Sequence, residues 1–292
     1  MTVKSSMPIR ALIAACLISA AYPGDFPALA QDAAMVPQPR TSVAGLSYAD
    51  IVDLADQAPL VANVRIRNII ALKGEQAIGV PLGHKRLFIE ADVVALIRGD
   101  AGITPVISYL YDAPTDSRGK LPKLKKAEMI VFARPGTRPG EVQLVQPDAQ
   151  IPASLQATEN VKAILSALVA SDAPPHILGI GDAFHVAGTI AGEGETQIFL
   201  RTQNGDPVSL SILRRPGQEP HWAVALGEIV DEAARPPEPG TLLWYRLACA
   251  LPADLPPRAT RSLPAPDAQA ARADYKLVID ALGPCGRTRK PG

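Results

Sequence analysis

Between residues 60 and 147 the chain repeats one pattern: short runs in which apolar and polar residues alternate, separated by turns rich in glycine and proline. Alternation with a period of two puts apolar side chains on one face of a strand, and such turns bring neighbouring strands together antiparallel. The runs are 64–67, 87–93, 106–111, 129–133 and 142–145. Five short strands of this kind predict a small antiparallel β-barrel, and an OB-like topology is the first choice.

Two neighbouring segments refine this prediction. Near the end of the run 85–98, Val94 and Leu96 place apolar residues at even as well as odd positions, so both faces of the strand are apolar there. This favours a bent strand that packs on both sides at a barrel corner. A short helix is expected before the first strand, capped by Ser47, with Asp50 in its first turn and Pro59 after its end. The apolar residues on one face of this helix are Ile51, Leu54, Ala55 and Ala58.

The second half of the chain has the pattern of a β-meander surrounded by helices. Strands are expected at 197–202, 208–212 and 222–226, and Asn204-Gly205 is a strong signal for a hairpin turn between the first two. Helices are expected at 153–170, 241–250 and 266–282. The predicted fold class is therefore α+β, with a small OB-like barrel lobe over 46–150 and a meander packed with helices over 153–290.

The first thirty residues have the order of a secretory signal peptide. Lys4 and Arg10 precede an apolar stretch at 11–21. The segment Ala28-Leu29-Ala30 then offers the small side chains that signal peptidase needs for a cut before Gln31. The sequence therefore predicts an exported chain that loses residues 1–30.

Two other readings of the leader are less consistent with its length. A helix of about eleven residues rises about 16 Å, roughly half of a bilayer core, which disfavours a transmembrane anchor. A lipoprotein site at Cys16 would leave an apolar region that is too short. We predict a cleaved leader, a flexible segment at 31–45, and a periplasmic or secreted protein that does not span the membrane.

Removal of the leader changes the cysteine count. Cys16 is lost, and Cys249 and Cys285 remain as an even number in an oxidising compartment. A disulfide between them would close a loop of about 37 residues and stabilise the fold by roughly 3–4 kcal/mol. The alternative of a redox pair is disfavoured because such pairs usually have Cys-x-x-Cys spacing.

The charge pattern limits the classes of partner. The chain has 29 Lys+Arg and 29 Asp+Glu, and this zero balance argues against a nucleic-acid-binding protein. One short stretch departs from the balance and is a candidate anion-contact loop, although most such runs are simply solvated. Its five basic residues are Arg118, Lys120, Lys123, Lys125 and Lys126.

No residue pattern assigns a catalytic site. The pair Ser117 and Lys120 fits Ser-x-x-Lys, but proline and glycine around it predict a loop, where an acyl-enzyme site needs a helix. His84, His176, His185 and His221 do not have the spacing of a helical zinc motif, so no metal and no cofactor are predicted. Two further segments, 179–184 and 192–195, are weak matches to a dinucleotide turn and to a carboxylate pair.

Several segments resemble a group of uncharacterised exported proteins of alphaproteobacterial type. They are 46–56, 121–126, 192–200 and 244–249, which spread over most of the chain after the leader. The resemblance implies export and carries no activity and no catalytic residue. The strand order over 46–133 is separately similar in outline to an OB-like barrel of the metalloproteinase-inhibitor kind, which is an analogy of fold alone.

Two functions follow as hypotheses. The first is a non-enzymatic binding protein of the cell envelope that holds another protein or an envelope polymer. The alternative is a periplasmic hydrolase with dispersed active-site residues, such as His185 with Glu193 or Glu195. The hydrolase predicts a deep pocket where His185 or His176 meets a carboxylate and a hydroxyl. The binding protein predicts an exposed groove or apolar patch without that convergence.

Overall fold

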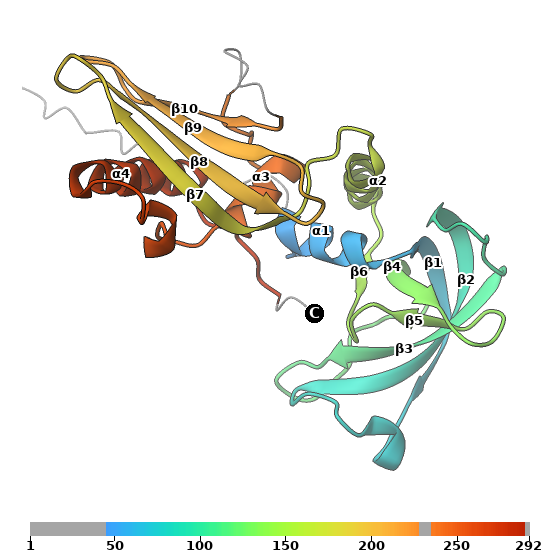
Figure 1. Cartoon of the computed structure of the whole chain (residues 1–292). Helices are drawn as coiled ribbons and strands as arrows, with labels where there is room; N and C mark the ends of the chain where they lie inside the picture. Colours follow the sequence, from blue (N-terminus) through green and yellow to red (C-terminus); the bar gives the residue numbers. More distant parts are fainter. Residues whose placement is uncertain (1–44, 228–234, 290–292) are drawn as a thin grey trace, which may run out of the picture. The chain divides into compact units, whose positions relative to one another are not determined.

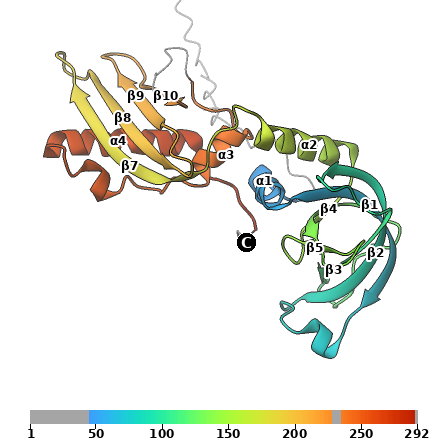
Figure 2. The same ribbon diagram turned by 45° about the vertical axis from the view of Figure 1, so that its right-hand side comes forward.

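The computed structural model describes residues 45–227 and 235–289, all of which fall within one structural unit, Pro39–Gly292. They form two antiparallel sheets and four α-helices, which confirms the predicted α+β class (Figures 1 and 2). The predicted signal peptide and nearly all of the predicted leader segment lie outside the described residues. The second sheet lies within the range assigned to the second lobe, and the first sheet lies within 46–150 except for its strand β6, which ends at Pro152. The lobe boundaries stay predictions.

Helix α1, Tyr48–Gln57, begins at the predicted cap. The Ser47 side chain accepts from the Asp50 amide at 3.1 Å, and the Asp50 carboxylate accepts from the Ser47 amide at 2.9 Å, so the two residues form a capping box. The predicted apolar face is buried in the core. The helix ends before Pro59, whose ring would clash with an extra turn.

The first sheet contains all five predicted strands and one more. Its strands are β1 (Leu60–Ala71), β2 (His84–Arg98), β3 (Val106–Pro114), β4 (Glu128–Pro135), β5 (Val142–Leu144) and β6 (Gln150–Pro152). The order is β3-β2-β1-β4-β5, and β6 pairs with β4. Strand β6 was not predicted because three residues are too few to show an alternation.

The two ends of this sheet, β3 and β5, approach each other at separate points. One isolated parallel bridge joins Ser108 to Glu141, and farther along the Asp112 amide donates to the Pro147 carbonyl at 2.7 Å. No continuous ladder closes the sheet in the part of the chain that is described. The closed barrel is therefore not found, and the OB-like topology stays a prediction.

The prediction that the end of β2 packs on both sides is wrong. Val94 is 47% exposed and Leu96 is 37% exposed, so one face of the strand remains open to solvent there. Strand β2 pairs with β1 through several register shifts, which bend the two strands away from a flat ladder.

Helix α2, Leu155–Val169, follows the first sheet and agrees with the predicted helix at 153–170. Ser154 caps it by accepting from the Ala157 amide at 3.1 Å. Val161, Ile164 and Leu165 are buried, as the periodicity predicted. Leu168 is only partly buried.

The second sheet has four strands, of which three were predicted. They are β7 (Ile177–Ala187), β8 (Gly194–Thr202), β9 (Val208–Arg214) and β10 (His221–Ala225), in the order β10-β9-β8-β7. Strand β7 was missed because Gly179, Gly181 and Asp182 interrupt its alternation. The same residues lie where its pairing with β8 shifts register, so bulges replace the regular pattern there.

Two helices complete the chain, and a disulfide joins their ends. Helix α3 is Leu242–Ala248, and helix α4, Ala265–Leu282, packs on β7 and β8 (Figure 1). Cys249, at the end of α3, is bonded to Cys285, just past α4, which confirms the predicted disulfide. Trp222, Trp244 and Tyr245 are buried in the core.

Candidate functional site

Two surface hollows lie beside the hairpin that joins β4 to β5. One has a volume of about 640 Å³ and reaches the β2–β3 loop at Ala101–Thr104. The other has a volume of about 740 Å³ and extends over β2 and β3. Both are lined by 136–139, Glu141 and Val142, so they adjoin across the hairpin. We call the two hollows together the seam groove.

The hairpin that divides the seam groove is held in one conformation by its glycines. The Gly136 amide donates to the Glu141 carbonyl at 2.8 Å, and a Cβ on Gly136 would lie 2.7 Å from that oxygen. Gly140 has a φ of +79°, and its carbonyl accepts from the Ser108 amide at 2.8 Å. Gly136 is thus required by the close approach of the two arms of the hairpin, and Gly140 by its positive φ and its close approach to β3.

The larger hollow combines an apolar floor with a buried ion pair. Phe88 and Leu110 are paired across β2 and β3, and both line the hollow. Beside them Arg86 donates two hydrogen bonds to Asp112, each 2.8 Å long, and these bonds raise the pKa of the guanidinium further. Arg138, on the hairpin, is an exposed cation in the same lining. Such a lining suits an elongated ligand with both apolar and hydrogen-bonding groups.

The five basic residues of the predicted anion-contact loop are all exposed. Their loop is ordered: the Asp116 carboxylate accepts from the amides of Arg118 and Lys120 at 2.9 and 2.8 Å, and Leu124 is buried. Lys85 also donates to the Gly119 carbonyl at 2.7 Å. The loop begins at 115, three residues after Asp112 of the seam groove, so the two features adjoin along the chain.

The hydrolase candidate His185 meets a hydroxyl and a carboxylate, as that hypothesis predicted and the binding-protein hypothesis did not. Its Nδ1 lies 2.8 Å from the Thr196 hydroxyl. Thr196 in turn donates to Asp274 on α4, which also pairs with Arg214. Sequence reasoning did not find Asp274, because the contact depends on how α4 packs on the sheet.

The geometry of this cluster is that of a structural network. The Thr196 hydroxyl donates its proton to Asp274, so its oxygen accepts a hydrogen bond from His185 Nδ1–H. A general base that activates a hydroxyl nucleophile would instead accept the proton from that hydroxyl. Thr196 is 0% exposed and Asp274 is 1% exposed, so a substrate cannot reach either group. The other side of the His185 ring packs on Gly194, where a Cβ would lie 3.0 Å from Cε1.

The remaining sequence candidates do not join His185. The side chain of Glu193 lies against Gly188, where a Cβ would be 2.4 Å from it. Glu195 is paired with Val186 and is exposed on the outer face of the second sheet, opposite to the face that holds Thr196. Ser117 and Lys120 lie in the exposed loop between β3 and β4, which confirms that they are not on a helix.

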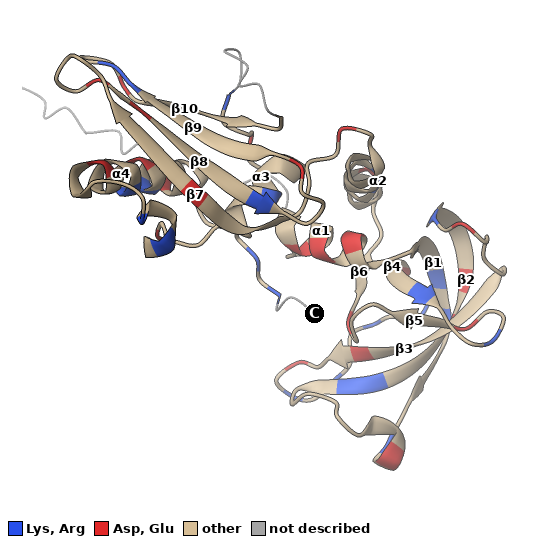
Figure 3. Ribbon diagram, in the orientation of Figure 1, with Lys and Arg blue, Asp and Glu red and all other residues tan. Residues whose placement is uncertain are grey.

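An acidic stripe on α1 was missed by the sequence analysis. Figure 3 shows acidic residues along this helix and basic residues on the segment that follows α4. Asp53 accepts from Arg287 Nε and Nη2 at 2.5 and 2.9 Å and from the Tyr245 hydroxyl at 2.5 Å. The spacing of Asp50, Asp53 and Asp56 at every third residue was the available signal, since it puts three carboxylates on one face.

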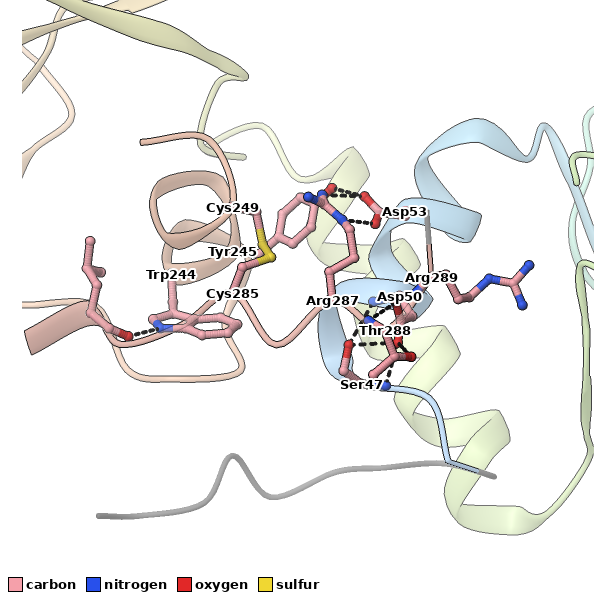
Figure 4. Close-up of a disulfide and its surroundings, with 11 residues drawn as sticks. Ser47, Asp50, Asp53, Trp244, Tyr245, Cys249, Cys285, Arg287, Thr288 and Arg289 are labelled. Carbon is pink, nitrogen blue, oxygen red and sulfur yellow. Dashed lines mark hydrogen bonds and ion pairs between the residues drawn. A yellow bond between two sulfur atoms is a disulfide. The ribbon is translucent and has the colours of Figure 1, made fainter. Parts of the chain in front are cut away.

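Asp50 binds the same C-terminal segment (Figure 4). Its carboxylate accepts from the amides of Thr288 and Arg289, each at 2.9 Å, and from the Thr288 hydroxyl at 2.6 Å. Burial acts to raise the pKa of Asp50, but the hydrogen bonds from Thr288, Arg289 and Ser47 outweigh it and lower the pKa. The carboxylate therefore stays charged and holds the segment 287–289 on α1.

His176 lies in a second contact with the stripe. Arg246 donates to its Nδ1 at 2.8 Å, and its Nε2 lies 3.4 Å from Asp56. A ring that accepts at Nδ1 is neutral, with its proton on Nε2 facing the carboxylate. Burial and the charge of Arg246 lower the pKa of His176, and Asp56 opposes this shift without cancelling it.

The stability of the protein is therefore expected to depend on the protonation of His176. Because the pKa is lowered in the folded state, the unfolded chain takes up the proton first, and stability falls as the pH drops below about 6.5. Between pH 7.5 and pH 5.5, the melting temperature of the His176→Gln variant should fall less than that of the wild type. The difference between the two falls should be no more than about 2 °C, because the ring is nearly half exposed. Calorimetry at both pH values measures this, and an unchanged difference would contradict it. His221→Gln, on an exposed residue, is the control.

Within 45–227 and 235–289, no three His, Cys, Asp or Glu side chains gather where they could hold a metal ion. None of the helices in these ranges is both long enough and apolar enough to cross a bilayer. No model of a known protein family matches the chain, and no curated protein matches it either.

Proposed function

We propose that the chain is an exported, non-enzymatic binding protein of the cell envelope and that the seam groove is its binding surface. The observation that carries this proposal is the pair of adjoining hollows, of about 640 and 740 Å³, on either side of a rigid hairpin. A preformed concave surface with a mixed apolar and polar lining is typical of binding sites. Export is supported by the signal-peptide pattern and by the Cys249–Cys285 disulfide, since disulfides persist in oxidising compartments.

The ligand in this proposal is an envelope protein or an envelope polymer. The two hollows continue past the hairpin, which favours an extended chain over a small compact molecule. The basic loop beside the groove adds exposed cations, and no ion partner is found for Lys120, Lys123, Lys125 or Lys126 among the described residues. We further propose the OB-like topology for the first sheet, supported by the parallel bridge between its ends.

The hydrolase remains the alternative because His185 does meet a hydroxyl and a carboxylate. Burial of Thr196 and the direction of its hydrogen bond both favour a structural role for that cluster. A change in the seam groove distinguishes the two functions. A binding protein loses its ligand when the groove is altered, whereas a hydrolase based on His185 would keep its activity.

The test compares capture of envelope components by immobilised mature protein, residues 31–292, and its variants. Leu110→Asp puts a charge on the floor of the groove and should lower the affinity for the captured component at least about tenfold, because a buried apolar contact becomes an unpaired carboxylate. Val186→Asp is the control, since Val186 is also an exposed aliphatic side chain, 69% exposed against 47% for Leu110, but lies on the second sheet. The affinity for the purified component is then measured by calorimetry.

Each outcome decides one part of the proposal. Equal affinity for wild type and Leu110→Asp would show that the seam groove is not the binding surface. The variant with alanine at Lys120, Lys123, Lys125 and Lys126 tests the basic loop, and equal capture by it would dismiss the loop as an anion contact. Circular dichroism establishes that every variant is folded before its binding is compared.

A further inference from the structure

A third hollow lies away from the seam groove, between the end of β2 and the second half of α2. Its volume is about 390 Å³, near the lower end of the range for small-molecule sites. Its lining comes from two short segments, which are separated in sequence by the rest of the first sheet. The lining residues are Leu96, Ile97, Arg98, Lys162, Leu165, Ser166 and Val169.

The floor of this hollow is apolar and open to solvent. Leu96 is 37% exposed, and Val169, at the end of α2, is 68% exposed. Leu96 lies against the bare backbone of Gly99, where a Cβ would be 3.2 Å from its Cδ1. Two exposed aliphatic side chains beside one hollow offer a surface from which an acyl chain would displace water.

The charged groups in the lining all have one sign. Arg98 and Lys162 contribute two cations, and no carboxylate lines the hollow. Arg98 is positioned by one bond, from its Nη1 to the Ala55 carbonyl at 3.1 Å, which leaves its other donors for a ligand. Lys162 pairs with Glu159 at 3.1 Å, but both are more than half exposed, and such pairs contribute little.

We propose that this hollow binds an anionic amphiphile, a single acyl chain that ends in a carboxylate or a phosphate. The chain would lie on Leu96, Leu165 and Val169, and the anionic head would meet Arg98 and Lys162. Charge complementarity selects the occupant, because an anionic head group would form ion pairs with Arg98 and Lys162 that a neutral amphiphile cannot form. The site is independent of the seam groove, since the two share no lining residue.

The test is a calorimetric titration of the mature protein with decanoate below its micelle concentration. Decanol is the control for charge, and acetate is the control for the chain. We expect decanoate to bind at one site, and decanol and acetate to bind at least about tenfold more weakly. Vesicles of an anionic phospholipid form a separate arm, which distinguishes a free amphiphile from a lipid head group.

Two variants shift the affinity in opposite directions if the proposal is correct. Lys162→Glu reverses one cation and should weaken decanoate binding at least about tenfold. Glu159→Gln frees Lys162 from its partner on the helix and should strengthen binding a few-fold. Both positions are exposed on α2, so folding should be unaffected. Equal binding of decanol and decanoate, or no change in either variant, would overturn the proposal, as would binding to vesicles alone.

Discussion

The variant Arg214→Met is expected to lower the free energy of unfolding by about 3 kcal/mol. Arg214 pairs with Asp274, which is 1% exposed, and among the described residues no other Lys or Arg forms an ion pair with this carboxylate. Methionine keeps the aliphatic stem and removes the charge, so a buried carboxylate is left with only the Thr196 hydroxyl. The effect should fall at the lower end of the range for broken buried pairs, because the Arg214 side chain is 36% exposed and water can reach it.

Denaturation in urea measures this loss, and Arg201→Met is the matched control. Arg201 lies on the same sheet but donates only one long bond, to the Leu178 carbonyl at 3.5 Å. Its replacement should change stability by less than about 0.5 kcal/mol. The double variant Arg214→Met with Asp274→Leu should recover part of the loss, because no unpaired charge remains. A single-variant effect as small as that of the control would show that the network does not stabilise the packing of α4.

Local patterns predicted those elements whose cause is local. The Ser47 cap of α1 depends on residues within one turn. The hairpin of β8 and β9 forms around Asn204-Gly205, although its connection is the longer segment 203–207, in which Gly205 has a φ of +83°. The cysteine pair was also predictable, because only two thiols remain after the leader. Strands β6 and β7 were not predictable in the same way, since one is too short and the other is broken by bulges.

The candidate sites depend on contacts between distant residues. The sequence offered His185 two nearby glutamates as partners, but the fold supplies Asp274 from a helix near the end of the chain. The seam groove lies where β3 and β5 approach each other at separate points without a continuous ladder, which is a property of sheet closure and not of any motif. In the same way, Val94 and Leu96 indicated burial, but they are exposed on a part of β2 that extends past its last pair with β3, which is Asp92 with Val106.

Removing the disulfide with Cys249→Ala and Cys285→Ala is expected to cost about 3–4 kcal/mol in the free energy of unfolding. The bridge closes a loop of 36 residues in sequence separation, and its loss restores the freedom of that loop in the unfolded chain. Guanidinium denaturation of the oxidised wild type and the double variant measures the difference. Reduction of the wild type should reproduce the effect of the variant, and identical stability of all three forms would contradict the entropic account.

The same variant should also loosen the C-terminal segment on α1. The bridge fixes Cys285 two residues before Arg287, so Arg287, Thr288 and Arg289 reach Asp53 and Asp50 from an anchored point (Figure 4). Without the anchor, the segment must be ordered at its own entropic cost each time it binds. Hydrogen exchange at the amides of Thr288 and Arg289, which both donate to Asp50, should therefore become faster.

The control for this second effect is Arg287→Gln, which weakens the contact of the segment with Asp53 and leaves the disulfide intact. It should speed exchange at Thr288 and Arg289 but should lower global stability much less than loss of the bridge does. If the cysteine variant lost stability while exchange at these two amides stayed slow, the ion pairs alone would hold the segment.

A peptide map of native protein without reductant tests the premise, because it should contain linked Cys249 and Cys285 peptides and begin at Gln31. An intact Met1 or two free thiols would remove the reason for expecting either effect in the cell.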